Sequence, residues 1–141
     1  MKLKNIFYAS LIIEFPILSI STYASQVVVV SANNSAEIRE SNIPRIFLGK
    51  IKSFSSGDSI LPINQKPGSD SRVEFDKKVL GKSGSQVKAY WSKLMFSGKG
   101  KPPKEMTSDS AVKAYIAENP NAIGYIDEAN VDATVKVVMK I

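Results

Sequence analysis

The sequence contains no cysteine and no histidine among its 141 residues. Without cysteine there are no disulfides, so a folded domain must be held together by its apolar core. Without either residue type, the usual ligands of zinc and copper are missing, and Cys–His or Ser–His nucleophilic catalysis is excluded. The scattered carboxylates, among them Glu74, Asp76, Asp127 and Glu128, form no acid–base pair at a defined spacing. We therefore predict that the protein is not an enzyme and that it uses no cofactor and no metal ion.

Long apolar stretches are also scarce, and the one that exists lies at the N-terminus. Two lysines precede the apolar residues 6–20, and Thr22-Tyr23-Ala24 follows with the small-x-small pattern of a signal-peptide cleavage site. Glu14 interrupts the stretch, whereas a retained transmembrane helix needs about 20 uninterrupted apolar residues. The sequence thus predicts a signal peptide over residues 1–24, export to the periplasm, and one domain over residues 25–141 that does not span a membrane after processing.

Acidic residues are outnumbered, with 13 Asp and Glu against 19 Lys and Arg, for a net charge of +6. A basic domain is suited to nucleic acid, to an anionic envelope surface or to small anions, and export leaves no expected role for nucleic acid. Three of the lysines, Lys99, Lys101 and Lys104, surround Pro102-Pro103. We interpret this cluster as a solvated loop, with contact to an anionic surface or a partner protein as the alternative.

Patterns typical of strands and helices alternate along residues 25–141. The β-branched run Gln26–Val30 predicts a strand, and its apolar character on both faces predicts a central one. The remaining predicted strands cover residues 60–64, 122–126 and 134–141, and the predicted helices begin near Ala36 or cover residues 45–48, 69–80, 85–96 and 108–118. In the helices we assign Val73, Tyr90, Trp91 and Phe96 to buried faces. This alternation implies a layered α/β fold.

The segment from Asn64 to Phe75 comes closest to a chemical site. It predicts the end of a strand, a glycine turn and a helix start, which presents free backbone N–H groups and the positive end of the helix dipole to an anion. Two interpretations stay open. In the first, Ser69 caps an ordinary helix, Asp70 complements the dipole and Arg72 is solvated. In the second, Ser69 and Ser71 donate hydroxyls to an oxyanion and Arg72 offers a two-pronged contact, while Asp70 opposes the bound charge.

Four segments occur in the order in which they are found in the phosphate-binding component of phosphate ABC transporters, and the sequence resembles that family. They are Ile46-Phe-Leu-Gly-Lys50, Pro62–Phe75, Trp91 with Phe96-Ser97-Gly98, and Asn119-Pro-Asn-Ala-Ile-Gly-Tyr-Ile126. The resemblance covers nearly all of residues 25–141. It implies one lobe of a type 2 periplasmic-binding-protein-like fold, an α/β domain whose mixed sheet is flanked by helices. In that family two lobes enclose phosphate.

The resemblance also implies where a ligand binds. The family has an arginine followed by Ser-Gly-Thr at a helix start, and these positions align with Gln65, Ser69, Asp70 and Ser71, so that two hydroxyls are kept while the arginine and the glycine are replaced. Arg72 or Lys66 is expected to supply the missing charge. The predicted site for phosphate or another small oxyanion therefore consists of Gln65, Ser69, Asp70, Ser71 and Arg72.

From this site and the resemblance we predict that the protein is an exported solute-binding module, which binds phosphate or a similar oxyanion for an ABC transporter. The alternative is an envelope protein-interaction or sensory module that keeps the lobe fold without binding phosphate, because a fold does not by itself specify a function.

Overall fold

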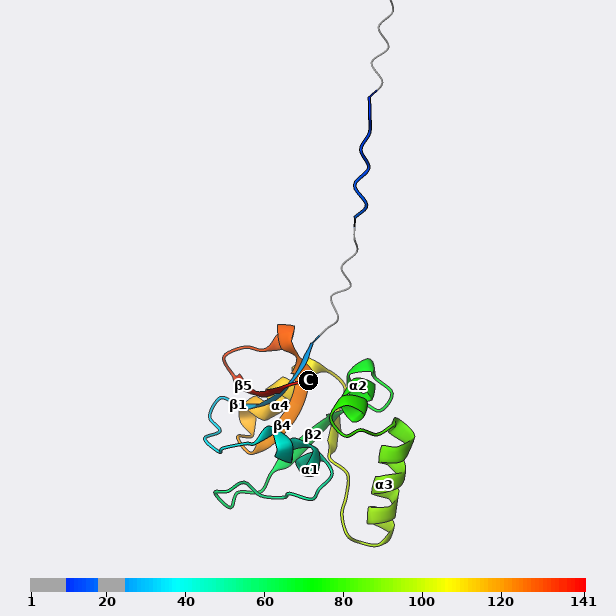
Figure 1. The fold of residues 1–141 in the computed structure, drawn as a ribbon. Helices are drawn as coiled ribbons and strands as arrows, with labels where there is room; N and C mark the ends of the chain where they lie inside the picture. The colour runs from blue at the N-terminus through cyan, green and yellow to red at the C-terminus, as the bar shows by residue number, and fades with distance from the viewer. Residues whose placement is uncertain (1–9, 18–24) are drawn as a thin grey trace, which may run out of the picture.

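A computed structural model describes residues 10–17 and 25–141 (Figure 1). Of the predicted signal peptide, residues 10–17 have no regular secondary structure and expose their apolar side chains, such as Leu11 and Ile17. The remainder of that peptide, including the predicted cleavage site after Ala24, lies outside the described residues. Within the described ranges, no helix combines the length and the apolar character needed to cross a membrane.

Residues 25–141 form a five-stranded mixed sheet with helices packed on it (Figure 1), which confirms the predicted α/β class. The strands are β1 (Gln26–Ser31), β2 (Leu61–Gln65), β3 (Lys104–Met106), β4 (Ala122–Asp127) and β5 (Val135–Lys140), in the order β3-β2-β4-β1-β5. Strand β2 is parallel to β3 and β4, while β1 is antiparallel to both β4 and β5. Because β1 has a partner on each side, its predicted central position is confirmed.

The helices of the described residues are α1 (Ile43–Phe47), α2 (Asp70–Lys78), α3 (Gly84–Phe96) and α4 (Asp109–Glu118), with 3-10 turns at Glu40–Asn42 and Glu128–Asn130. Ser69, Ser83 and Ser108 are the N-caps of α2, α3 and α4, and each side chain accepts a hydrogen bond from the backbone N–H three residues later. These serines fix the helix starts near the predicted positions.

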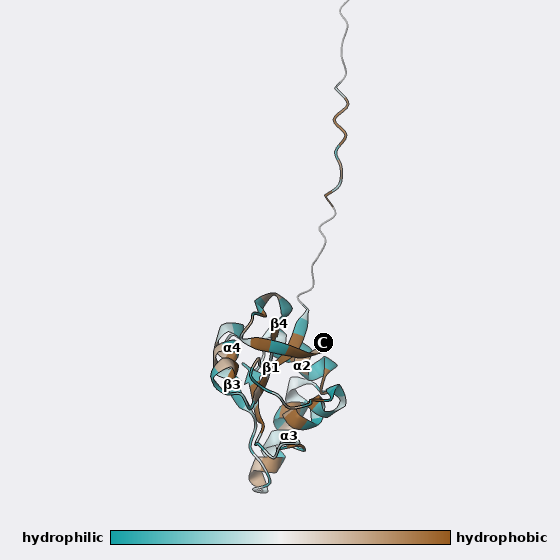
Figure 2. Ribbon diagram, turned by 90° about the vertical axis from the view of Figure 1, so that its left-hand side faces the viewer, coloured by the Kyte–Doolittle hydropathy of each residue, from teal (hydrophilic) through white to brown (hydrophobic). Residues whose placement is uncertain are grey.

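The core lies on both faces of the sheet, as the two-sided apolar pattern of β1 requires. Val28 and Val30 pack with Phe47 of α1 and Phe75 of α2, whereas Val27 and Val29 point to the opposite face and pack with α4. In Figure 2 the strands carry brown, hydrophobic stretches, and teal, hydrophilic residues lie on α2 and α4. Burial of each such side chain contributes about 1.5–3 kcal/mol, so the alternation along β1 holds both helical layers to the sheet.

Two glycines of the family-like segments allow close packing. A Cβ atom on Gly124 of β4 would lie 2.8 Å from a methyl carbon of Val112 and 3.0 Å from one of Ile116, both in α4. A Cβ atom on Gly49 would lie 3.0 Å from the Trp91 ring, and Gly49 also has a φ of +70°, which other residues rarely adopt. These glycines therefore set how closely α4 and α3 approach the rest of the domain.

Several local predictions are wrong. No helix begins near Ala36, because the Asn34 side chain accepts a hydrogen bond from the Ala36 N–H (2.7 Å) and stabilises a turn instead. The short strand β3 was not predicted, since only pairing with β2 makes it a strand. Val73 and Phe96 are 53% and 98% exposed. Only Val87 and Trp91 of α3 are buried, and Figure 1 shows this helix standing beside α2, away from the sheet.

Candidate functional site

The predicted site lies at the carboxyl edge of the parallel strands. Strand β2 ends at Gln65 and strand β4 at Asp127, and helices α2 and α4 begin beside them. Ligands of open α/β sheets bind at this edge, where loops and helix starts meet. The fold thus brings the five predicted residues to one place through β2, the following turn and the first residues of α2.

The Ser69 side chain makes its hydrogen bonds within the turn before α2 and the first turn of that helix. Its Oγ accepts a hydrogen bond from the Arg72 N–H (3.3 Å) and donates one to the Lys66 carbonyl (2.8 Å). The backbone N–H groups of Asp70 and Ser71 and the Ser71 hydroxyl have no hydrogen-bond partner within residues 25–141. The start of α2 therefore offers three free donors, next to the exposed carboxylate of Asp70.

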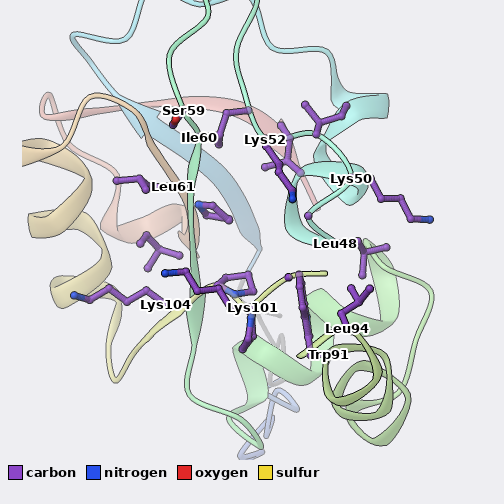
Figure 3. A pocket seen from close by; sticks show the side chains of 18 of the residues that line it. Leu48, Lys50, Lys52, Ser59, Ile60, Leu61, Trp91, Leu94, Lys101 and Lys104 are labelled. Atoms are coloured by element: carbon purple, nitrogen blue, oxygen red, sulfur yellow. The ribbon is translucent and has the colours of Figure 1, made fainter. Parts of the chain in front are cut away.

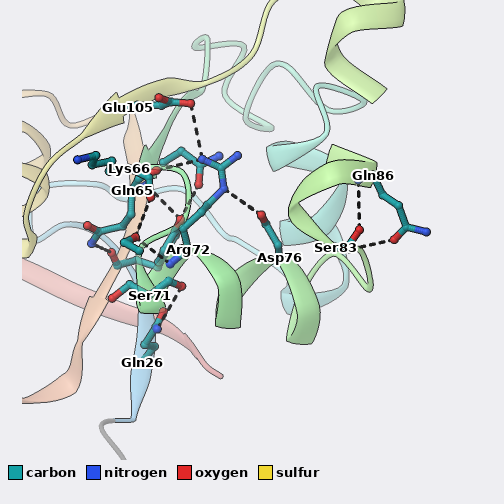
Figure 4. A network of polar contacts seen from close by, with 12 residues as sticks. Gln26, Gln65, Lys66, Ser71, Arg72, Asp76, Ser83, Gln86 and Glu105 are labelled. Atoms are coloured by element: carbon teal, nitrogen blue, oxygen red, sulfur yellow. Dashed lines mark hydrogen bonds and ion pairs between the residues drawn. The ribbon is translucent and has the colours of Figure 1, made fainter. Parts of the chain in front are cut away.

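Arg72 is buried and paired, not solvated (Figure 4). Its Nε donates to both carboxylate oxygens of Asp76 at 3.1 Å, and its Nη1 donates to the Gln65 carbonyl at 3.0 Å and lies 3.7 Å from the Glu105 carboxylate. Burial raises the pKa of Asp76, and the Arg72 charge offsets part of that effect. The guanidinium thus joins α2 to the ends of β2 and β3, and two carboxylates already balance its charge.

Gln65 points away from the start of α2. Its side chain is buried, and Nε2 donates to Asp109 Oδ1 (2.6 Å) and to the Tyr125 carbonyl (3.1 Å). The Tyr125 hydroxyl accepts from the Gln65 N–H (3.0 Å) and donates to Asn64 Oδ1 (2.5 Å), while burial raises the pKa of this phenol. The position that corresponds to the family's arginine therefore holds β2, β4 and α4 together.

The sequence predicted the helix over residues 108–118, but not that its start nearly repeats the start of α2 and that Asp109 has a structural role there. Residues 69–73 read Ser-Asp-Ser-Arg-Val, and residues 108–112 read Ser-Asp-Ser-Ala-Val. At α4, the Asp109 carboxylate accepts from Gln65 Nε2, from the Asp127 N–H (2.9 Å) and from Asn130 Nδ2 (2.8 Å). The repeated pentapeptide is the signal that could have directed attention to Asp109. Neighbouring groups thus occupy the Asp109 carboxylate, whereas the Asp70 carboxylate accepts no hydrogen bond within residues 25–141, although the N–H groups of Asp109 and Ser110 have no partner there either.

A cavity of about 560 Å³ adjoins this region between α2 and α3. Arg72, Asp76 and Glu105 form part of its wall together with apolar side chains, including Val73, Trp91 and Met95. The carboxylates make this wall unfavourable for a second anion. In the described ranges, no group of three Asp or Glu side chains is arranged to hold a metal ion.

The fold of residues 25–141 is similar to about half of several solved phosphate-binding proteins. An ABC-type phosphate transport receptor from Vibrio cholerae superposes with a TM-score of 0.63 at 19% identity, covering 82% of this chain and 45% of the receptor. A candidate phosphate ABC transporter substrate-binding protein from Clostridium perfringens, solved with bound phosphate, gives 0.63 at 21% identity, covering 81% and 44%. PstS from Borrelia burgdorferi gives 0.59 at 16% identity, covering 80% and 46%.

The chain thus spans less than half the length of these solved proteins, which corresponds to one of their lobes. At these identities the similarity establishes the fold alone. The first two of these neighbours are a transport receptor and a substrate-binding protein. No protein-family profile matches the chain. No curated protein matches it in sequence.

Proposed function

We propose that this protein is an exported, periplasmic solute-binding module that binds phosphate or a similar small oxyanion at the start of α2 and serves an ABC transporter. The open start of α2 carries the proposal. Two backbone N–H groups and the Ser71 hydroxyl lie at the carboxyl edge of β2, without acceptors in the described part of the chain. Such donors, together with the helix dipole, favour an anion. The phosphate bound to the Clostridium perfringens protein, whose fold is similar, supports the choice of ligand.

The five predicted residues have different roles in this proposal. The N–H groups of Asp70 and Ser71 and the Ser71 hydroxyl contact the oxyanion. Ser69 keeps the helix start in place through its cap, and Gln65 anchors the neighbouring strand ends. Arg72 is a positioning residue, because its Nε is held by Asp76 and its Nη1 by the Gln65 carbonyl, which orient the side chain along α2 toward the strand ends.

Binding is expected to be weak. One lobe leaves the far side of the ligand in water, which reduces every charge-assisted contact, and the Asp70 carboxylate opposes a dianion. We expect a dissociation constant on the order of 1 mM, which corresponds to about 4 kcal/mol of binding free energy.

An NMR titration of residues 25–141 with phosphate at constant ionic strength tests the proposal. The amide signals of Asp70 and Ser71 should shift and saturate, while those of Asp109 and Ser110 at the start of α4, where three hydrogen bonds hold the Asp109 carboxylate, should not. Ser71→Ala should weaken binding about threefold to tenfold through loss of one hydrogen bond, and the matched control Ser110→Ala should leave it unchanged. Equal shifts at both helix starts, or no saturation up to roughly 20 mM phosphate, would rule the site out.

A second candidate function is an envelope protein-interaction or sensory module that keeps the fold without phosphate. The pairing of Arg72 with Asp76 and Glu105 favours it, because the only arginine near the predicted site is already neutralised. The exposed apolar side chains of Val73 and Met95 at the cavity between α2 and α3, and of Phe96 at the end of α3, also favour it. This function would be supported instead if phosphate caused no change in the NMR titration and a defined envelope protein co-purified with the parent protein but not with Val73→Asp.

A further inference from the structure

A second cleft lies at the opposite end of β2 and is independent of the proposed oxyanion site. The loop after α1, the first residues of β2 and β3, and helix α3 enclose about 660 Å³, with the side chains shown in Figure 3. The cleft is lined by Leu61, Pro62 and Ile63 at the start of β2, whereas the proposed oxyanion site follows the other end of that strand. A volume of this size suits a small organic molecule.

Lysines dominate the charge of this cleft. Five of them, Lys50, Lys52, Lys99, Lys101 and Lys104, line it, so we call it the lysine cleft. No Asp or Glu is among its lining residues, and none of the five lysines forms an ion pair within residues 25–141. Residues 25–141 contain 17 Lys and Arg against 12 Asp and Glu, so these five charges equal the net charge of the domain. A bound anion would relieve their mutual repulsion.

The floor of the lysine cleft is apolar and pre-formed. Leu61 and Leu94 are partly exposed to it, and the Trp91 ring is held against Gly49, where even one added carbon atom would lie at 3.0 Å. The Tyr90 hydroxyl donates to the Leu48 carbonyl (2.6 Å) and fixes α3 to the loop after α1. Figure 3 shows Lys52 and Lys101 close to the apolar side chains of this floor. Positive charge therefore surrounds a rigid apolar surface.

From this arrangement we propose that the lysine cleft binds a soluble organic anion with an apolar body, such as an alkyl or aryl phosphate, sulfonate or carboxylate. The apolar body packs on Trp91, Leu61 and Leu94, and the anionic group contacts the lysines at the rim. Inorganic phosphate does not fit this site, because it would leave the apolar floor in water. A flat anionic membrane is a poor match as well, because the apolar surface lies inside a concave space.

Trp91 is the only tryptophan in the chain, so its fluorescence reports on the cleft directly. In a titration of residues 25–141, octyl phosphate should change the Trp91 emission and saturate at a concentration at least tenfold below that needed for octanol. Inorganic phosphate should leave the emission unchanged, whether or not it binds at α2. Equal affinity for octanol and octyl phosphate would overturn the proposal, as would a response to anionic phospholipid vesicles alone.

Trp91 also borders the cavity between α2 and α3, which Lys88 lines, so matched variants must separate the two spaces. The double variant Lys52→Gln/Lys101→Gln should weaken octyl phosphate binding at least tenfold, and Lys88→Gln should change it less than twofold. All variants should keep the thermal midpoint of the parent, because these lysines are exposed and form no ion pairs in the described ranges. Weakening by Lys88→Gln and not by the double variant would place the ligand in the other cavity and refute the proposal.

Discussion

Helices α2 and α4 begin with nearly the same five residues but bury different parts of them. In Ser69–Val73 of α2, the arginine is buried and the valine is 53% exposed. In Ser108–Val112 of α4, the valine is fully buried and lies against Gly124 of β4. The cap serines make equivalent hydrogen bonds in both helices. The pentapeptide thus determines that a helix begins, while the surface beneath each helix determines which side faces the core.

The aspartates differ in the same way. Asp109 accepts three hydrogen bonds that tie α4 to the ends of β2 and β4, whereas the Asp70 carboxylate is exposed and makes none within residues 25–141. The Asp109 carboxylate therefore connects α4 to the strand ends, whereas the Asp70 carboxylate at α2 is exposed to solvent. Four predictions follow from these structural roles, given from the largest expected effect to the smallest.

Arg72→Ala makes the two pentapeptides identical, and it should nevertheless destabilise the domain by about 3–5 kcal/mol. The substitution leaves Asp76 buried without its cation and removes the bond to the Gln65 carbonyl. The pKa of Asp76 is raised in the folded state. The folded protein therefore loses stability when the pH rises above the ordinary carboxyl pKa of about 4, because Asp76 must then ionise in a buried place. The loss measured by urea unfolding should therefore be smaller at pH 4 than at pH 7.

The matched control is Arg72→Met/Asp76→Leu, which removes both charges and keeps apolar volume. It should recover more than half of the lost stability. A loss below about 1 kcal/mol in Arg72→Ala would mean that the Arg72–Asp76 pair is not a structural element of α2.

Asp109→Ala should destabilise the domain by about 2–3 kcal/mol, because it leaves the buried Gln65 amide short of an acceptor and frees the Asp127 N–H. Asp70→Ala removes only a favourable interaction with the helix dipole, so the expected cost is about 0.3–1 kcal/mol. Urea midpoints of the two variants, measured side by side, give this difference. Equal losses of stability would contradict the distinction between the hydrogen-bonded Asp109 carboxylate and the exposed Asp70 carboxylate.

Asp70→Asn should raise the affinity for phosphate about threefold to tenfold, because it removes a like charge beside the proposed ligand and keeps the side-chain shape. Asp109→Asn should leave the affinity for phosphate unchanged, because that side chain lies outside the proposed site and contacts Gln65, Asp127 and Asn130. Calorimetric titration of both variants with phosphate checks the pair. A drop in affinity for Asp70→Asn would argue that the anion does not sit at α2.

The smallest effect concerns Asp132, which helps to hold the chain before β5 against α4. Hydrogen bonds from Thr134, and then the contact with Lys113 of α4 (2.9 Å), lower the pKa of Asp132 to about 2. A carboxylate whose pKa is lowered in the folded state stabilises the protein at pH values above the ordinary carboxyl pKa of about 4. That stability is lost as the pH falls from about 4 toward 2. Asp132→Asn should therefore flatten the pH dependence of the thermal midpoint between about pH 4 and 2. An unchanged slope would show that Asp132 makes no contribution to folding.

The sequence alone predicted the α/β class, the central position of β1 and the start of α2, because local signals encode each of them. Two-sided apolar patterning marks a buried strand, and a serine followed by an acidic residue marks a helix N-terminus. These signals depend on residues close together in the chain. The short strand β3 has no such signal, since its pairing with β2 involves residues about 40 positions apart.

The sequence by itself determined that a helix starts at Ser69 beside the end of a strand, because a serine cap and a glycine turn act locally. The tertiary structure alone decided what that start can do. It turned Arg72 toward Asp76 and Gln65 toward Asp109, and it left the N–H groups of Asp70 and Ser71 without partners among the described residues. It also gathered five lysines from two distant segments around Trp91. The Gln65–Asp109 contact and the lysine cleft join groups that only packing brings together, whereas Arg72 and Asp76 are i,i+4 neighbours in α2 and only their burial depends on packing.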